Sequence, residues 1–445
     1  MPHHGKGNLM RHKGTIGALM MVLGLGLAAA ARADETEALK AYARGEYVAV
    51  VAMLAGPYGE GKAGIQERLI LARAHLHLDR GDEALAVLRS VLESDRENPE
   101  ANALTGRILH EAGKHQEALP YLKDAHRLKQ DAATAATLGK CHYALGDLPK
   151  AKALLAAALA EDIRDPSNAL LLGKICLATG FGALAERYLL QAEEAGLESE
   201  ELWLLLGRAY LAQKKEVGPI VTLRVPDFAV AMPGGAKPGQ VVHGHIILGP
   251  AEDAPDRLRA ATRFSALYEG YRLLERSPDH PDALHMAAAG WLAGGEPALA
   301  RPHLDKLAAL EPDSRRTADL RARLLLAVKD FGALERLVAD AHQKKVLDDR
   351  TAAETYYQAA LILRAEGKRP EAVRLLKKAE ALHATSSKVL RSLADLSLAT
   401  GRPADAEGYY ARMVELFPDA PDIDELRNAL KVLQEKRGSE RGAEQ

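Results

Sequence analysis

Residues 201–212 read ELWLLLGRAYLA, a stretch in which Trp203, Leu206, Gly207 and Tyr210 have the spacing W-x2-L-G-x2-Y. A small residue inside an apolar helical pattern allows a second helix to approach closely. Steps of 33 or 34 residues back from Gly207 reach five more small residues in apolar helical surroundings. They are Gly173, Gly139, Gly106, Ala72 and Ala38. This regular spacing predicts an array of helical pairs along the chain.

The predicted units share small residues at two further positions. A glycine that tolerates positive φ ends the first helix, and an alanine starts the buried stripe of the second helix. The glycines are Gly113, Gly146 and Gly180, and the alanines are Ala118, Ala151 and Ala185. The pattern resembles the tetratricopeptide repeat family over residues 34–436. The resemblance implies an all-α, right-handed superhelical solenoid of about ten helix pairs, whose concave groove holds a protein or peptide segment.

The composition agrees with a helical array. The 445 residues exceed one ordinary globular core, but a solenoid grows by adding neighbouring repeats. Only 4% of the residues are aromatic and 27% are charged, which suits helices packed through small side chains and argues against disorder. The formal net charge is -2, and it becomes -6 without residues 1–33, which hold four basic and no acidic side chains. The chain therefore has no overall basic excess that would indicate a nucleic acid partner.

The first residues have the pattern of a secretory signal peptide. Residues 1–33 begin with basic side chains, continue as an apolar run over Ile16–Ala31 and end in Ala-Arg-Ala. This pattern predicts cleavage before Asp34, export to the periplasm and no stable membrane span afterwards. An uncleaved anchor is the alternative, but the run is short for a membrane span and closes on small residues.

The repeat register breaks after Lys214 and resumes near Ala261. We therefore predict an N-terminal array over residues 34–214, an insertion over residues 215–260 and a C-terminal array over residues 261–420. The break lies between the two helices of one repeat. Because insertions in arrays lie in loops, which often carry function, this segment is either a binding element or a decoration without a partner.

The insertion has the composition of a small β structure. Proline and glycine stand at its ends and between short β-branched runs, which is typical of strands separated by turns. The predicted strands are Ile220–Val225, Phe228–Met232 and Gln240–Leu248, the last of which ends at Gly249-Pro250. Residues 233–239 would join the second and third strands as a hairpin.

The end of the chain is predicted to be a capping helix and a polar tail over residues 421–445. Leu426, Leu430 and Leu433 fall on one face of a helix over residues 423–435. Such a helix would cover the open end of a solenoid. The polar residues from Arg437 onwards are expected to fray.

No catalytic motif is present in the sequence, so no enzyme activity and no cofactor are expected. Residues 110–115 read HEAGKH, which differs from the zinc protease motif H-E-x-x-H by one position. Gly113 is predicted to end that helix, so His115 is expected to point away from His110. The sequence has no G-x-S-x-G, no phosphate-binding loop and no C-x-x-C.

Phe228, His243 and His245 are the candidate binding residues of the insertion. Alternation along a strand would put His243 and His245 on the same face, within reach of one metal ion. Two ligands do not make a site, so an enzyme or metal protein built on the insertion would need a third ligand. Two exposed strand histidines are the favoured interpretation.

Cys141 and Cys176 are the two cysteines of the chain, and they fall one repeat apart. A disulfide needs Cα atoms within about 7 Å, which is closer than packed helix axes usually lie. We therefore expect two buried free thiols.

Basic residues at one position of successive repeats predict a binding surface. The residue after the small one is basic in five successive units, and we call these five residues the basic ladder. They are Arg73, Arg107, Lys140, Lys174 and Arg208. This position faces the groove in the family that the chain resembles, so the ladder would attract an acidic peptide. Ion pairing with glutamates of adjacent helices is the other interpretation.

The sequence thus predicts a non-catalytic periplasmic scaffold that grips an extended segment of another protein. Polysaccharide export, secretion and pilus-type machinery are the kinds of envelope assembly that similar exported repeat proteins serve. The main alternative is a protein that binds an anionic polysaccharide along the ladder. A glycan groove would need aromatic side chains, and the expected groove positions hold none; they are Leu69, Ala103, Ala136, Leu170 and Leu204.

Overall fold

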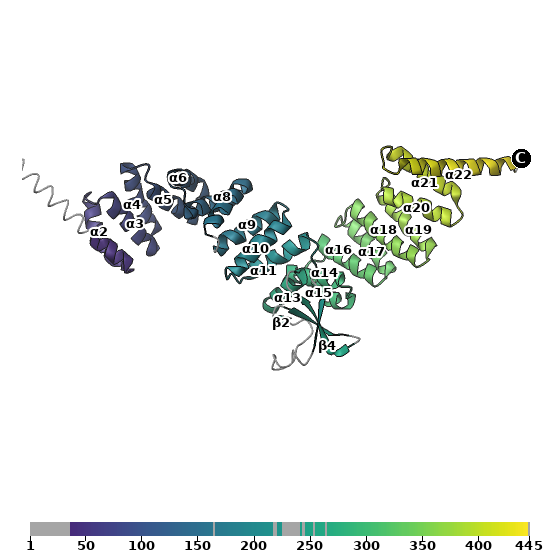
Figure 1. The fold of residues 1–445 in the computed structure, drawn as a ribbon, viewed down its shortest axis with the longest axis horizontal. Coiled ribbons are helices and arrows are strands. Elements are labelled where there is room, and N and C mark those ends of the chain that lie inside the picture. The colour runs from purple at the N-terminus through teal and green to yellow at the C-terminus, as the bar shows by residue number, and fades with distance from the viewer. Residues whose placement is uncertain are drawn as a thin grey trace, which may run out of the picture. The chain divides into compact units, whose positions relative to one another are not determined.

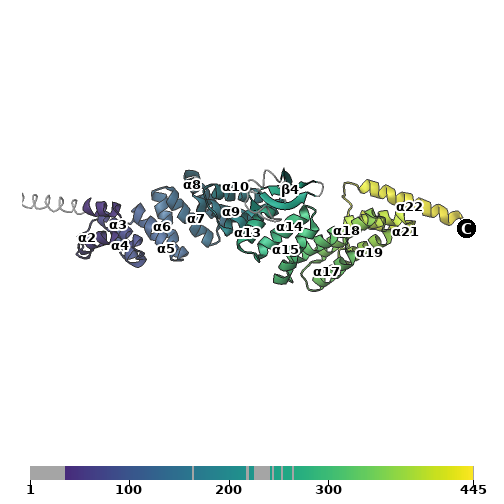
Figure 2. The same ribbon diagram turned by 90° about the horizontal axis from the view of Figure 1, so that it is seen from below.

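The computed structural model describes residues 36–162, 165–216, 220–224, 241–242, 245–251, 254–262 and 265–443. The expected leader, the expected strand Phe228–Met232 and the turn at residues 233–239 lie outside these ranges. The chain divides into two compact units, one of Met1–Thr179 with Arg187–Leu197 and the other of Gly180–Glu186 with Glu198–Gln445. Each unit consists of stacked helix pairs (Figure 1; Figure 2).

The first unit follows the predicted repeat. After helical residues 36–43, its helices are α2 (Tyr47–Gly59), α3 (Ile65–His77), α4 (Gly81–Ser94), α5 (Pro99–Glu111), α6 (His115–Leu128), α7 (Ala132–Ala144), α8 (Leu148–Glu161) and α9 (Pro166–Ala178). The helix α10 (Gly182–Glu194) is divided between the units. The pairs α3 and α4, α5 and α6, and α7 and α8 pack together, and each second helix also contacts the first helix of the next pair.

The small residues allow the two helices of a pair to touch. A Cβ atom at Gly106 would lie 2.5 Å from Leu122 Cγ, and one at Gly173 would lie 2.5 Å from Leu189 Cδ2. Leucines of the second helices fill the space beside them, and each is fully buried: Leu88, Leu122, Leu155 and Leu189. The spacing that predicted the array is therefore the spacing of these close helix contacts.

The second unit continues the same architecture. Its helices are α11 (Glu200–Ala212), α13 (Ala266–Arg276), α14 (Pro281–Ala293), α15 (Pro297–Leu310), α16 (Arg315–Ala327), α17 (Phe331–Gln343), α18 (Asp349–Ala365), α19 (Arg369–Leu382), α20 (Ser387–Ala399), α21 (Pro403–Leu416) and α22 (Ile423–Ala443). The helix α11 packs against α13 as a pair, and α22 packs on α21 at the end. The fold is therefore an array of helix pairs, as the sequence predicted.

Four strands lie between α11 and α13. They are β1 (Ile220–Arg224), β2 (Val241–Val242), β3 (His245–Ala251) and β4 (Ala254–Thr262), and they form an antiparallel sheet in the order β1-β4-β3-β2. The strands β2, β3 and β4 contact α13. The strands β3 and β4 pair antiparallel as far as Ala251, which lies opposite Ala254.

The end of this strand segment differs from the sequence prediction. Gly249 and Pro250 were expected to end the last strand, but they lie inside β3, opposite Arg259 and Leu258. The register shifts on either side of this pair, and such irregularities accommodate glycine and proline within a strand. Because residues 254–262 form β4, the helix α13 begins at Ala266 and not near Ala261.

The last helix is longer than predicted. Leu426 is buried against α21, and Leu430 and Leu433 pack on the same cluster, as the capping helix requires. The helix then continues to Ala443 through the residues expected to fray. An ion pair between Arg437 and Glu407, 2.8 Å long, ties this extension to α21.

Candidate functional site

The first helices of the first unit carry four ladder residues at equivalent positions. Arg73, Arg107, Lys140 and Lys174 lie on α3, α5, α7 and α9 and are partly or fully exposed, and each directly follows a buried alanine or glycine. The first helices α5 and α7 also contact each other directly. We call the exposed side of α3, α5, α7 and α9 the first-helix face.

The ladder residues also reach across to neighbouring helices. Arg73 pairs with Glu100 in the first turn of α5, and Lys140 Nζ donates to Ser167 Oγ in the first turn of α9, at 3.2 Å. Arg107 lies 3.8 Å from Glu111 of its own helix. These contacts are partly exposed, and exposed ion pairs contribute only about 0–1 kcal/mol to stability. The ladder is therefore partly charge-compensated, as the pairing interpretation expects, while its cationic side chains stay accessible to solvent.

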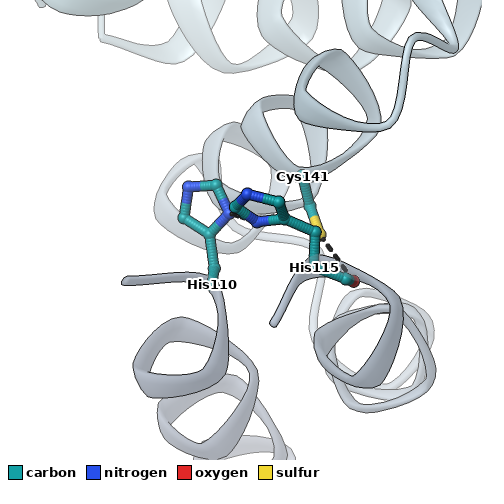
Figure 3. Close-up of side chains that lie close together, drawn as sticks. All are labelled: His110, His115 and Cys141. Carbon is teal, nitrogen blue, oxygen red and sulfur yellow. Dashed lines mark hydrogen bonds between the residues drawn. The ribbon is translucent and has the colours of Figure 1, made fainter. Parts of the chain in front are cut away.

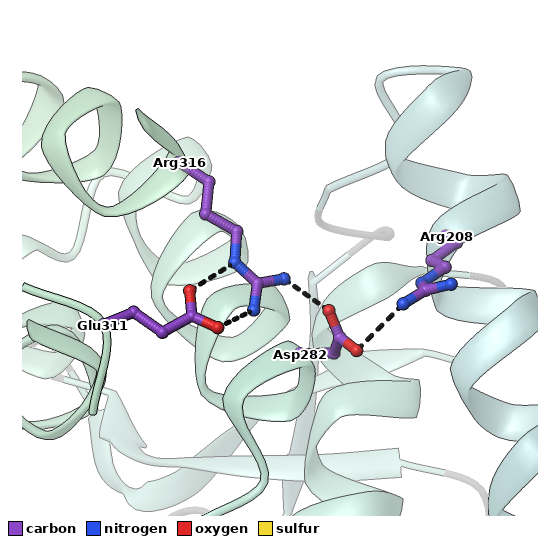
Figure 4. Close-up of polar contacts among 4 residues, drawn as sticks. All are labelled: Arg208, Asp282, Glu311 and Arg316. Carbon is purple, nitrogen blue, oxygen red and sulfur yellow. Dashed lines mark hydrogen bonds and ion pairs between the residues drawn. The ribbon is translucent and has the colours of Figure 1, made fainter. Parts of the chain in front are cut away.

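Arg208, the fifth ladder residue, belongs to the second unit and to a different environment. Its Nη2 donates to Asp282 Oδ2 of α14 at 3.0 Å, and Arg316 of α16 donates to the other carboxylate oxygen. Arg316 also donates to Glu311 at 2.6 and 2.8 Å, as Figure 4 shows. Burial would raise the pKa of Asp282, but the hydrogen bond from Arg316 and the charge of Arg208 hold that pKa below its usual value. Arg208 is therefore part of a charge network in which each charged group has a partner of opposite sign.

A further basic residue of the same kind was missed in the sequence. Arg323 on α16 follows the buried Ala322, just as Arg208 follows Gly207, and it donates to Glu216 at 2.7 and 3.2 Å. Ala322, the small residue before Arg323, could have indicated this position in the sequence. The repeat between Arg208 and Arg323 has Ala289 at the ladder position, so the row of basic residues is interrupted there. His285 lies near these charges, and burial, followed by the charge of Arg316, lowers its pKa to about 4.

One of the three candidate residues of the strand segment, His245, lies within the described residues. Phe228 and His243 lie outside the described residues. The backbone of His245 begins β3 opposite Thr262 and also pairs with Val242. The prediction of one strand over Gln240–Leu248 was therefore wrong: the segment holds two strands, β2 and β3, which pair antiparallel with each other. The alternation that would put His243 and His245 on one strand face is lost, and a metal site on them stays a prediction that lacks a third ligand.

The chain turns at Gly113 as predicted, but the predicted orientation of His115 was wrong. His115 does not point away from His110, because their Nδ1 atoms lie 3.1 Å apart and the ring centroids 4.9 Å apart. The turn between α5 and α6 is only a few residues long, so the start of α6 lies beside the end of α5. Cys141 of α7 lies beside both rings, as Figure 3 shows. Cys141 and Cys176 are both buried thiols that are not bonded to each other.

The described surface includes two hollows. One of about 560 Å³ lies between α20, α21 and α22, and its lining includes Arg391, Phe417 and Asp422. Another of about 380 Å³ in the first unit is lined by residues that include Arg89 and Tyr121. Neither is lined by a ladder residue. The described part of the chain also contains no helix with the length and apolar character needed to cross a membrane.

Comparison with known families identifies the repeat. Two sequence profiles described as tetratricopeptide repeat match the chain, one over residues 109–175 and 363–430 and the other over residues 70–133. No curated protein matches the sequence.

Several solved structures match parts of the chain at low sequence identity and low TM-score. PilF of Pseudomonas aeruginosa is 20% identical with a TM-score of 0.38, over 42% of this chain and 86% of that one. MamA of Desulfovibrio magneticus is 18% identical with a TM-score of 0.35, over 37% and 94%. A tetratricopeptide repeat protein of Parabacteroides merdae is 14% identical with a TM-score of 0.40, over 69% and 100%.

Proposed function

We propose that this chain, parts of which match tetratricopeptide repeat models, is a non-catalytic scaffold whose first-helix face binds an extended acidic segment of a partner protein. The observation that carries this proposal is the recurrence of Arg73, Arg107, Lys140 and Lys174 at one position of successive first helices. A row of cationic groups at regular intervals complements a chain that presents carboxylates at intervals.

The existing ion pairs of the ladder do not prevent such binding. Exposed pairs contribute about 0–1 kcal/mol each, so a partner carboxylate replaces one at small cost. The contact between Arg107 and Glu111 is long, at 3.8 Å, and is the weakest of them. A guanidinium group that takes up a carboxylate by two parallel hydrogen bonds gains both energy and orientation. Arg107 is therefore the first residue that we expect a partner to engage.

An anionic polysaccharide is the alternative ligand for the same face. Polysaccharide grooves commonly use aromatic side chains as stacking surfaces beside their polar groups. The five expected groove positions hold only leucine and alanine, and two of them, Leu69 and Ala136, are buried. This chemistry favours a peptide over a sugar chain.

The proposed setting is the periplasm, in an envelope assembly such as polysaccharide export, secretion or pilus-type machinery. The composition of residues 1–33 supports it, because a basic start, a short apolar run and an Ala-Arg-Ala end are typical of a cleaved signal peptide. Mass spectrometry of the protein recovered from an envelope fraction tests this setting. A mature chain that begins at Asp34 supports export, and an intact start refutes cleavage at this point.

Capture of partners from an envelope extract tests the scaffold. The bait is the full chain, compared with a variant carrying Arg107→Glu, Lys140→Glu and Lys174→Glu. A matched control reverses Arg89, Lys123 and Arg187, which are exposed residues of second helices in the same unit. A protein partner that is lost with the ladder variant and kept with the control supports the proposal. Loss with both variants contradicts it, and capture of polysaccharide without protein favours the alternative.

A further inference from the structure

Three side chains of the kinds that bind transition metals converge inside the first unit. His110 lies in the last turn of α5, His115 is the first residue of α6 and Cys141 lies on α7. One ligand atom from each lies within 4.8 Å of the others. Figure 3 shows the two imidazole rings side by side and the sulfur of Cys141 next to the His115 carbonyl group.

The backbone holds the two imidazoles in place. Gly113 has a φ of +74°, which lets the chain reverse directly after α5. The turn is closed by hydrogen bonds from Gly113 N to His110 O at 2.9 Å and from Lys114 N to Leu109 O at 2.8 Å. The two histidines are therefore positioned by a tight, hydrogen-bonded turn and not by long flexible side chains.

The third ligand comes from the next repeat. Cys141 is fully buried, and its thiol donates a hydrogen bond to the carbonyl oxygen of His115 at 3.1 Å. That carbonyl lies in the first turn of α6, where carbonyl groups also accept a hydrogen bond from the helix itself. The carbonyl oxygen of His115 therefore does not need the hydrogen bond from the thiol, and the sulfur of Cys141 is available to another partner.

The distance between the two imidazole nitrogens fits a tetrahedral metal ion. Zinc–nitrogen bonds of about 2.0–2.1 Å place two nitrogen ligands of a tetrahedron about 3.3 Å apart. The two Nδ1 atoms are 3.1 Å apart, which is close to that value. Zinc–sulfur bonds of about 2.3 Å place the sulfur about 3.6 Å from each nitrogen. The three ligand atoms lie within 4.8 Å of one another, so the sulfur would have to move closer to the nitrogens by at most the difference between these two distances.

We propose that His110, His115 and Cys141 form a three-ligand site for a zinc ion, with its fourth coordination position open. Two imidazoles and one thiolate form a borderline-soft donor set that suits zinc and does not suit calcium or magnesium, which take oxygen ligands. On binding, the thiol of Cys141 releases its proton to solvent and the sulfur bonds to the metal. The ion then ties the α5–α6 turn to α7, and so one repeat to the next.

The same geometry has a second explanation without metal. One neutral imidazole can donate its Nδ1–H to the Nδ1 of the other, and the thiol then keeps its hydrogen bond to the carbonyl group. This arrangement binds no metal, so the two explanations are separated by a direct titration.

The test is a titration of the full chain with zinc alone, after reduction of the thiols and removal of metal with a chelator. We expect one equivalent to bind and the thermal midpoint to rise with zinc concentration. Cobalt in place of zinc should give a thiolate-to-metal charge-transfer band in the near ultraviolet. Calcium and magnesium should do neither. Absence of stoichiometric zinc binding overturns the proposal.

Three variants locate the site. Cys141→Ser should abolish the charge-transfer band, and His115→Gln should weaken zinc binding by more than about 100-fold, since even the loss of a residue that only hydrogen-bonds to a metal ligand costs about 10–100-fold. Cys176→Ser is the matched control, because Cys176 is equally buried one repeat away. Circular dichroism verifies folding, and His115→Gln, at a partly buried position, decides the question if the serine variant is unstable. Zinc binding that is unchanged in both ligand variants contradicts the site.

Discussion

Arg208 and Asp282 form a 3.0 Å ion pair although 74 residues separate them in the sequence. The pair joins α11, before the strands, to α14, after them, so the helical array of the second unit continues past the strand segment. Asp282 is the shared acceptor, since Arg316 binds its other oxygen. The carboxylate therefore connects α11, α14 and α16.

Replacing Asp282 by asparagine should destabilise the second unit. The change removes the negative charge between Arg208 and Arg316, and loss of a largely buried charge partner costs about 1–3 kcal/mol. Because the pKa of Asp282 is lowered in the folded protein, this contribution is present above about pH 4 and is lost as the pH falls further. Urea unfolding at pH 7 and below pH 3 checks both statements. An equal difference between variant and parent at the two pH values would contradict the assignment.

The strand segment should be removable without unfolding the array. Ala266 N donates to Lys215 O at 3.0 Å and Leu267 N donates to Glu216 O at 3.1 Å, so the two ends of the segment are held together. Replacing residues 218–263 by a short Gly-Ser linker should keep the helical content and cooperative unfolding.

The boundaries of that deletion matter. A shorter deletion that ends at Pro250 leaves β4 without its partners β1 and β3, and should expose it to aggregation. Calorimetry and light scattering of the two deletions, side by side, distinguish these outcomes. Loss of cooperative unfolding in the longer deletion would show that the sheet stabilises the array.

His285 should make the second unit less stable as the pH falls below neutrality. Its pKa is lowered to about 4 by burial, so the unfolded chain takes up a proton near its usual value of about 6.5 while the folded chain does not. Stability therefore decreases from about pH 6.5 towards pH 4, by at most about 3 kcal/mol. His285→Gln should remove that part of the pH dependence. A slope that is unchanged in the variant would refute the assignment to His285.

Adding a methyl group at Gly106 should destabilise the first unit. Alanine is preferred to glycine in helices by about 1 kcal/mol, but the new Cβ would lie 2.5 Å from Leu122 Cγ, and such overpacking costs about 1–3 kcal/mol. Gly408, in α21, is the matched control because a Cβ there meets no atom within 4 Å. Gly106→Ala should lower the thermal midpoint, while Gly408→Ala should leave it unchanged or raise it. Stabilisation by both would mean that Leu122 gives way at no cost.

The features that the sequence predicted correctly are those with a local, repeated cause. Gly106 and Gly173 mark close helix contacts, and Leu426 marks the face of the final helix, because each depends on spacing within one or two helices. The convergence of His110, His115 and Cys141 could not be predicted, since it depends on how a turn meets the next repeat. Gly249 and Pro250 were misleading, because an irregular strand tolerates glycine and proline.

The most direct test of the scaffold is the affinity of the full chain for a fluorescent peptide of alternating glutamate and serine. Its analogue with glutamine in place of glutamate is the neutral control. We predict salt-sensitive binding of the acidic peptide alone, weakened about tenfold or more by Arg107→Glu, Lys140→Glu and Lys174→Glu, since each reversed contact removes up to about 1 kcal/mol. Reversal of Arg89, Lys123 and Arg187 should leave the affinity within about twofold. Equal losses in the two triple variants, or equal binding of the glutamine analogue, would contradict recognition by the first-helix face.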